Sequence, residues 1–533
     1  MPLFHRRLLT SIWILCATLI ALSGPGAQAQ KVEAQVHVLD NGMKFLLLPR
    51  EGDPNVSAGW VAKVGSVNER PGLTGVAHLF EHMMFKGTHT IGTKDIDRDL
   101  EIISQLDALR AQVRDEEETL IEQHRRGLID NPKDPASRSD EHNRLLGEFG
   151  RLLTEQRELI IKDQFDRIYT LQGASGLNAF TSHDLTLYMI NVPANKLELW
   201  FWMESDRLSN PVFREFYSER DVVQEERRLR VESRPTGKLD EQFETLFWQS
   251  SPYHWPVIGW QSDLDGLTRD EALEFFSTYY APNNLTVALV GDFDPEQAVS
   301  WAEKYFGRLK RGGSEPEPVR TWEIEQQAET RMTGYADTRP TVRVRFHTVA
   351  DAHREEPALL VLSSLLNGRT GRLYKSLVLE QKVATNAGAA VNGMKYDGYF
   401  ELSGIAAEGH TPEDVEQALY QEMKVLQEQL VGDRELRKVK NQQLASDFRR
   451  LRSKTNLMIQ LLIYEALGDW ENINKFSDRI QAVTAEDVRA VARKYFKPEN
   501  RNVGIYHTKE GAKGRRGRDG PRPGGRPGAG GGP

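Results

Sequence analysis

The sequence predicts an α+β protein built from two related domains. With 533 residues, the chain is longer than one hydrophobic core usually supports. Strand-like and helix-like patterns alternate through both halves. The strand "RNVGIYH" closes the second half much as "NNLTVALVGDF" closes the first. This repetition indicates a weak internal duplication of one α+β unit.

Composition and charge limit the function classes. Hydrophobic residues make up 39% of the chain and charged residues 27%, as in soluble globular proteins. The formal net charge of -8 argues against a nucleic-acid binder, whose domain would usually be strongly basic. We therefore expect no nucleic-acid partner.

The N-terminus has the pattern of a secretory signal peptide over residues 1–29. Arg6 and Arg7 supply the positive charge, an apolar stretch covers 8–22, and a small-x-small cleavage site lies at 27–29. We expect export to the periplasm or secretion. An uncleaved membrane anchor is the alternative, but the apolar run is short for a span and a cleavage site follows it.

The only cysteine, Cys16, lies inside this segment. A leucine precedes it where a lipoprotein signal would have a small residue, so lipidation is not expected. The mature chain would then have no thiol, which excludes cysteine catalysis and thiolate metal ligands.

The first half begins with a β-hairpin predicted over 36–49, with its turn at 40–42, "DNG". A strand-like run follows at 56–65, and a helix is expected to begin near Val76. Residues 95–166 are strongly charged, with Leu and Ile at helical spacing and two prolines in the middle. This pattern is typical of a helical hairpin with a polar exterior.

Further elements are expected along both halves. The predicted strands lie on either side of a turn at 182–184 and at 283–293, 341–349, 387–393, 398–405 and 501–507. The predicted helices are 194–208, 215–233, 268–280, 356–366, 371–381, 412–431, 433–449, 455–467 and 484–495.

Composition also suggests the domain limits. A linker at 316–325 would separate an N-terminal domain, 30–315, from a C-terminal domain, 326–508. The Gly-, Arg- and Pro-rich tail, 509–533, cannot form a core and is predicted to be disordered.

The motif His78-Leu79-Phe80-Glu81-His82 points to metal chemistry. His78 and His82 are four residues apart, so both imidazoles leave the same face of a helix and can bind one ion. Glu81 is close enough to reach a water on that ion. Zinc suits two imidazoles and a carboxylate with one open position, and it activates water for attack on a peptide carbonyl. His-x-x-Glu-His is the inverted form of the common zinc-protease motif.

The surrounding residues strengthen this interpretation against an accidental match on a surface helix. Large apolar side chains surround the motif and predict a buried helix: Leu79, Phe80, Met83, Met84 and Phe85. Two histidines and a glutamate are costly to bury unless they are paired or bound to a metal.

A third ligand must come from elsewhere, and "SERDVVQEERRLR" offers Glu219, Glu225 and Glu226 on one predicted helix. Glu219 and Glu226 are seven residues apart and share a face, whereas Glu225 points away from it. One ligand with a supporting carboxylate two turns earlier would use that face. Taken alone, the run would be an ordinary solvated charged helix.

Four segments together resemble the pitrilysin/insulinase family of zinc peptidases, in particular its shorter bacterial members similar to mitochondrial processing peptidase. They are "GLTGVAHLFEHMMFKGT", "GLNAFTSHDLTLY", "ERDVVQEERR" and "YYAPNNLTVALVGDFDP". With weaker similarity in the second half, the resemblance covers most of 33–508 outside the charged insertion. The combination is far more specific than any one motif.

The resemblance implies one zinc ion per chain, held by His78, His82 and Glu226. It implies that Glu81 is the general base and that Glu219 is a supporting carboxylate. The nature of the ligands alone does not separate zinc sharply from manganese or cobalt.

The resemblance also implies a fold and a substrate site. The fold would be a clamshell of two homologous domains, each a mostly antiparallel sheet packed with helices, with the helical hairpin inserted in the first. Asn178, Ala179 and Phe180 would lie on an edge strand that pairs with the backbone of an unfolded peptide. Without the family, "LNAFT" would be read as an ordinary strand.

Two features depart from the family pattern. The spacing from His82 to Glu226 is about 70 residues longer than usual, which corresponds to the hairpin at 95–166. That hairpin would border the chamber between the two halves of the clamshell, bind a partner, or be a passive surface insertion. In the second half, Arg372 matches a substrate-binding arginine, but Thr385 stands where the family has a tyrosine.

Some family members divide the work between a zinc-bearing chain and a homologous chain that carries the arginine and tyrosine. We therefore hypothesise that full activity needs such a second subunit, with a homodimer as the alternative.

The function predicted from the sequence is that of an exported zinc metalloendopeptidase acting on unstructured peptides. The rival predictions are a non-catalytic scaffold derived from a peptidase, and a peptide-binding chaperone whose zinc is structural.

Overall fold

The computed structural model describes residues 31–312 and 315–510. The predicted signal peptide and the tail from Gly511 onward lie outside the described residues. Among the described helices, none is both long enough and apolar enough to span a bilayer.

The first half contains a six-stranded sheet in the order β1-β2-β6-β3-β5-β4. Its strands are β1 (Gln35–Val38), β2 (Lys44–Pro49), β3 (Asn55–Ala62), β4 (Ser175–Thr181), β5 (Thr186–Pro193) and β6 (Leu285–Gly291). β2 and β6 pair in parallel, and all other neighbours are antiparallel. The hairpin predicted over 36–49 is confirmed as β1 and β2.

The second half contains a five-stranded sheet in the order β7-β11-β8-β10-β9. Its strands are β7 (Thr330–Ala336), β8 (Thr341–Thr348), β9 (Ala384–Gly393), β10 (Gly398–Ala406) and β11 (Arg501–Thr508). The order repeats β2-β6-β3-β5-β4, including the one parallel pair, here β7 with β11. The predicted duplication and the α+β fold class are therefore confirmed.

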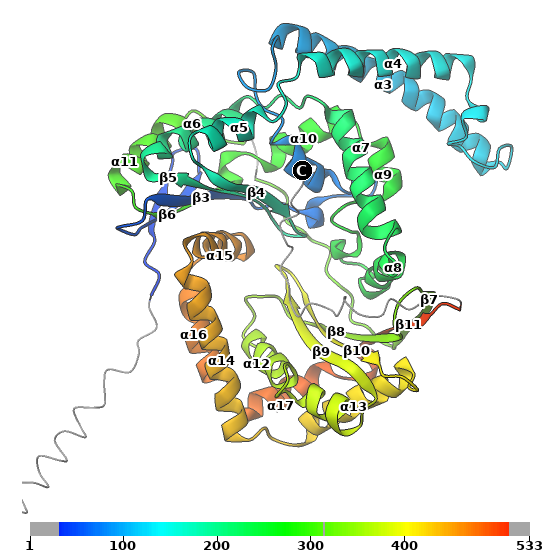
Figure 1. Cartoon of the computed structure of the whole chain (residues 1–533), viewed down its shortest axis with the longest axis vertical. Helices are drawn as coiled ribbons and strands as arrows, with labels where there is room; N and C mark the ends of the chain where they lie inside the picture. Colours follow the sequence, from blue (N-terminus) through cyan, green and yellow to red (C-terminus); the bar gives the residue numbers. More distant parts are fainter. Residues whose placement is uncertain (1–30, 313–314, 511–533) are drawn as a thin grey trace, which may run out of the picture. The chain divides into compact units, whose positions relative to one another are not determined.

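Helices pack around both sheets (Figure 1). In the first half they are α2 (Val76–Met83), α3 (Ile96–Arg125), α4 (Asp140–Leu159), α5 (Gln164–Leu171), α6 (Leu197–Ser209), α7 (Phe216–Arg227), α8 (Gly237–Phe247), α9 (Gln261–Gly266), α10 (Arg269–Tyr279) and α11 (Pro295–Trp301). In the second half they are α12 (Glu356–Leu366), α13 (Pro412–Glu428), α14 (Asp433–Arg452), α15 (Lys454–Leu467), α16 (Asn472–Ala482) and α17 (Ala485–Tyr495).

Most helices predicted from the sequence are present within a few residues. The sequence reasoning missed α8, α9, α11 and α16, and the helix expected over 371–381 is π-helical over Tyr374–Glu380. Two more π-helical segments, η4 (Arg228–Glu232) and η7 (Ala302–Phe306), continue α7 and α11. The domain limits at 30–315 and 326–508 stay predictions, and no helix or strand lies between Gly307 and Glu329 in the described part.

Each half contributes one helix to the sheet of the other half. α15, from the second half, contacts β3 and β6 of the first sheet, and its Glu465 lies between Lys44 and Lys63 at 2.6 and 2.8 Å. α8, from the first half, contacts β7 of the second sheet (Figure 1). Each sheet has its own hydrophobic cluster, and each also buries part of its surface under a helix of the other half.

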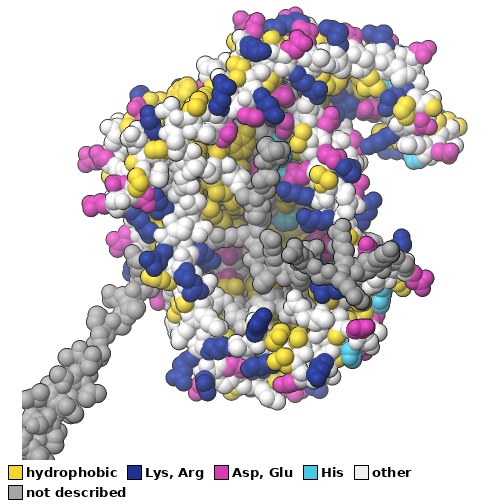
Figure 2. Space-filling view, in the orientation of Figure 1, with side chains coloured by type: hydrophobic (Ala, Val, Ile, Leu, Met, Phe, Trp, Pro, Cys, Tyr) yellow, Lys and Arg dark blue, Asp and Glu magenta, His cyan; other side chains and the backbone are white. Residues whose placement is uncertain are grey.

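The charged insertion is the predicted helical hairpin, made of α3 and α4 side by side. Leu and Ile at helical spacing, such as Ile102, Leu106 and Leu145, are buried along one face. Figure 2 shows acidic and basic side chains intermixed over its outer surface. A polar exterior over a narrow apolar stripe explains why the insertion is charged and still helical.

A buried ion pair anchors the hairpin. Arg214, just before α7, donates through Nε to Asp99 of α3 at 2.8 Å, and both side chains are almost fully buried. The same guanidinium donates to the backbone oxygens of Lys86, Thr88 and Ile91, in the segment after α2. The base of the hairpin is thus held against the loop that connects it to α2.

We expect Asp99→Asn to destabilise the chain by about 3 kcal/mol, because it leaves the buried Arg214 charge without its counter-ion. Urea denaturation measures the loss. Glu101→Gln, which removes a partner of the exposed Arg98, is the matched control and should change stability little. Equal stability of both variants would contradict the anchoring role of Asp99.

Candidate metal centre

α2 carries the sequence motif and is held by its apolar side. The ring of Phe80 is buried against Phe213, Phe275 and Tyr280, with ring centroids 5.0 to 5.8 Å apart. Because residues four apart share a helix face, this packing leaves His78 and His82 together on another face. That face lies against α7 and β4.

Two carboxylates hold the start of α2. Glu69 is buried and accepts hydrogen bonds from the backbone N–H groups of Gly75 and Ala77 at 2.9 and 2.8 Å. Asp263 accepts from the N–H and hydroxyl of Thr74 at 3.2 and 2.7 Å. Such bonds satisfy N–H groups that a helix leaves unpaired at its N-terminus. Burial raises the pKa of Glu69 well above its usual range.

The backbone at Gly75 also fixes this start. Its φ is +90°, and a Cβ there would lie 2.8 Å from the carbonyl oxygen of Ile258. Only glycine meets both conditions without strain.

His78, His82 and Glu226 come together between α2 and α7. Glu226 Oε2 lies 3.6 Å from His78 Nε2 and 3.5 Å from His82 Nε2. One ligand atom from each of the three residues lies within 4.8 Å of the others. Among the described residues, this is the one group of three or more His, Cys, Asp or Glu side chains placed to hold a metal ion.

The donor set fits zinc. Two imidazoles and one carboxylate are a common catalytic ligand set for this ion, which leaves one position open. His78 is buried, and its Nδ1 has no hydrogen-bond partner within the described part of the chain. A buried histidine is stabilised when an ion replaces the lost solvent.

Residues beyond the ligands orient them. Arg230, in η4, binds Glu226 Oε1 at 2.5 Å and leaves Oε2 facing the histidines. Glu219 Oε2 lies 3.4 Å from His82 Nδ1, while its other oxygen binds Lys86. The sequence reasoning missed Arg230 and Lys86, although each follows a site residue by four positions. Arg230 lies in η4, which continues α7, and Lys86 lies just after the end of α2.

The pKa values reflect this pairing. Burial and the neighbouring His82 lower the pKa of His78 to about 4. Burial alone would lower the pKa of His82, but hydrogen bonds to Glu219 and Glu226 raise it to about 9. Burial alone would raise the pKa of Glu226, but His82, His78 and Arg230 hold it at about 2. At neutral pH one histidine is therefore charged and the other neutral.

Glu81 lies beside this group and next to β4. The hydroxyl of Thr181, the last residue of β4, donates to Glu81 Oε2 at 2.8 Å. Burial raises the pKa of Glu81 above its usual value. The sequence reasoning assigned no role to Thr181, and nothing in its local pattern indicates this bond.

The residues predicted to bind substrate fall into two places. Asn178, Ala179 and Phe180 lie on β4, which is at the edge of the first sheet and contacts α2. In the second half, Arg372 donates its two hydrogen bonds to Glu435 at 3.0 and 2.7 Å. Thr385 lies on β9, the edge strand of the second sheet. The substrate-binding roles of Asn178, Ala179, Phe180 and Arg372 stay predictions.

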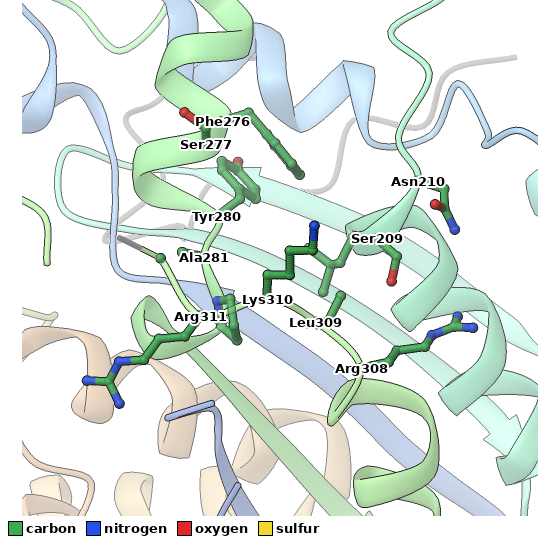
Figure 3. A pocket seen from close by; sticks show the side chains of 13 residues that line it. Ser209, Asn210, Phe276, Ser277, Tyr280, Ala281, Arg308, Leu309, Lys310 and Arg311 are labelled. Atoms are coloured by element: carbon green, nitrogen blue, oxygen red, sulfur yellow. The ribbon is translucent and has the colours of Figure 1, made fainter. Parts of the chain in front are cut away.

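A large cavity of about 650 Å³ lies elsewhere, between the end of α6, the end of α10 and the segment after η7. It is lined by Arg308, Lys310 and Arg311 but by no histidine or carboxylate. These three side chains are exposed, and Figure 3 shows Arg308 and Arg311 pointing in different directions. This cavity has none of the chemistry of the metal group.

Comparison with known proteins matches two segments of this chain to descriptions of one family. The family description "Insulinase (Peptidase family M16)" matches residues 45–110, and "Peptidase M16 inactive domain" matches 266–443. The "Zinc protease PqqE" of Helicobacter pylori is 25% identical over 92% of this chain and 96% of its own length. The chain is therefore similar to the insulinase family in both of its halves. The first match ends inside α3, where the hairpin insertion interrupts the family pattern.

A second relative and a solved structure are similar to this chain as well. The "Probable mitochondrial-processing peptidase subunit beta" of Arabidopsis thaliana is 24% identical over 60% of this chain and 62% of its own length. The crystal structure of a protease from Helicobacter pylori superposes with a TM-score of 0.72 at 22% identity, covering 90% of this chain and all of that one. The predicted resemblance and the fold of two homologous domains are confirmed.

We expect one zinc ion to bind per chain and to displace about one proton at pH 7, because His82, with its pKa of about 9, is protonated without the ion. The apparent affinity should rise about tenfold per pH unit from pH 7 towards 9. Titration calorimetry in two buffers of different ionisation enthalpy counts the protons. Binding without proton release, or stoichiometric binding to His82→Ala, would contradict the assignment.

Proposed function

We propose that this protein is a zinc-dependent endopeptidase that hydrolyses unstructured peptides. The observation that carries the proposal is the group of His78, His82 and Glu226 with the carboxylate of Glu81 beside it and the free edge of β4 next to it. Zinc at this site would act as a Lewis acid and lower the pKa of a water molecule.

Glu81 would remove the proton from that water during attack on the scissile carbonyl and pass it to the leaving amine. Its raised pKa supports this role, because a more basic carboxylate accepts the proton of the water more readily. The hydrogen bond from Thr181 holds the carboxylate in one orientation. Glu219 would support His82 from the side opposite to Glu226.

The edge strand would bind the substrate. β4 pairs with β5, with Asn178 opposite Met189 and Ala179 opposite Tyr188, and no other described strand pairs with its outer side. An extended peptide can add to such an edge through backbone hydrogen bonds. Only a chain segment without its own secondary structure has these groups free, which supports unstructured peptides as substrates. The sequence of residues 1–29 supports action outside the cytoplasm.

Two rival functions remain distinct from this proposal. A non-catalytic scaffold needs no ligands, so the presence of all three together with Glu81 disfavours it. A peptide-binding chaperone with structural zinc would keep the three ligands but would not depend on Glu81. The description "Peptidase M16 inactive domain" belongs to the match at 266–443, which does not include the metal group.

We expect Glu81→Gln to reduce peptide hydrolysis by about 10²–10⁴-fold while zinc stays bound, because the amide cannot accept the proton. Hydrolysis of a mixed pool of unstructured peptides is compared with zinc content for both proteins. Glu225→Gln, on the outward face of α7, is the matched control and should keep full activity. Peptide binding without hydrolysis, unchanged in Glu81→Gln, would favour the chaperone, and a zinc-free wild type would favour the scaffold.

We also propose that a second, homologous subunit completes the site. Thr385 stands where the family has tyrosine, and a relative of this chain is named as a subunit of a processing peptidase. We expect the purified chain to bind zinc but to hydrolyse peptides slowly, and a homologous partner to raise the rate. Activity measured across a gel-filtration profile tests this. A fully active monomer would rule out the need for a partner.

A further inference from the structure

α8 is joined to the second sheet by two ion pairs. Arg345, fully buried on β8, donates through both terminal nitrogens to the carboxylate of Glu244 at 2.6 and 2.8 Å. Arg343 donates to Asp240, one turn earlier on α8, at 2.8 Å. Two-pronged bonds of this kind fix orientation as well as distance.

The second sheet holds these arginines rigidly. Glu401 on β10 accepts from both Arg343 and Arg345, at 2.8 to 3.1 Å. Burial alone would raise the pKa of Glu401, but the two guanidinium groups hold it at about 2. The ring of Phe247, at the end of α8, stacks on His347 with centroids 3.9 Å apart. α8 therefore has little freedom to move relative to β8 and β10.

α8 is also bound to α7, the helix that carries the metal ligand. Arg227, the residue after Glu226, is buried and donates through both terminal nitrogens to Glu241 of α8 at 2.7 and 2.8 Å. Between the helices, η4 carries Arg230, which binds Glu226. At the start of α8, a Cβ on Gly237 would lie 2.0 Å from the carbonyl oxygen of Val231, so η4 and α8 are in close contact.

We propose that the second sheet positions the metal ligand Glu226, through Arg345, α8 and Arg227. The inference rests on the metal site of the proposed function and adds positioning residues to it. Ligand distances that differ by a few tenths of an ångström weaken a metal site. A helix joined by two-pronged ion pairs to both β8 and α7 transmits small displacements of one half to the ligand in the other.

The test uses Glu244→Gln in the full chain, because Glu244 is partly exposed and the change keeps its shape. Zinc affinity is measured by competition with a chromogenic chelator. We expect it to fall about tenfold, as for other groups that orient metal ligands. Arg345→Lys, which keeps the charge but loses the two-pronged geometry, should cause a fall in the same direction.

Glu465→Gln is the matched control, since Glu465 joins α15 to the first sheet through Lys44 and Lys63 but has no link to α7. It should lower the melting temperature and leave zinc affinity unchanged. Unchanged affinity in Glu244→Gln, or an equal fall in Glu465→Gln that follows the loss of stability, would overturn the proposal. No peptide is used, so a chain that binds zinc as expected but cleaves nothing contradicts only the proposed function.

Discussion

In the first half of the chain, charged and polar side chains lie between α2 and α7, and the fold has to pair them with one another. His78 is buried and His82 and Glu226 are partly buried, and each such group loses hydration that must be replaced. The structure replaces it with pairing: Glu226 faces both histidines, and Arg230 binds its second oxygen. A metal ion at the centre would complete this balance, because two imidazoles and a carboxylate supply it with three ligands.

The surrounding fold can be understood as support for this arrangement. α2 is fixed at its start by Glu69 and Asp263 and along its length by the aromatic contacts of Phe80. α7 is fixed before its start by Arg214, which also anchors the inserted hairpin, and at its last residue by Arg227. The hairpin therefore adds a long helical pair without interrupting the contact between α2 and α7.

The duplicated fold gives the two halves different tasks. Both sheets have the same strand order and the same single parallel pair, and each receives a helix from the other half. Only the first half carries the histidines and Glu226. The second half instead contributes Arg343 and Arg345, which bind α8. α8 follows Glu226 along the chain, separated from it by η4. A duplicated architecture can thus retain chemistry in one copy while the other copy keeps a structural role.

The sequence by itself determined the local features. Hydrophobic periodicity and turn residues predicted most strands and helices, because these signals depend only on neighbouring residues. The spacing of His78, Glu81 and His82 predicted one shared helix face, and the duplication was visible in the closing strands. The tertiary structure decided what depends on residues far apart in the chain. The contacts of Asp263 with Thr74, of Thr181 with Glu81, and of Arg345 with Glu244 each join separate elements, and no local pattern encodes them. These contacts follow from how buried charges find partners when the chain packs, and only the folded chain brings those partners together.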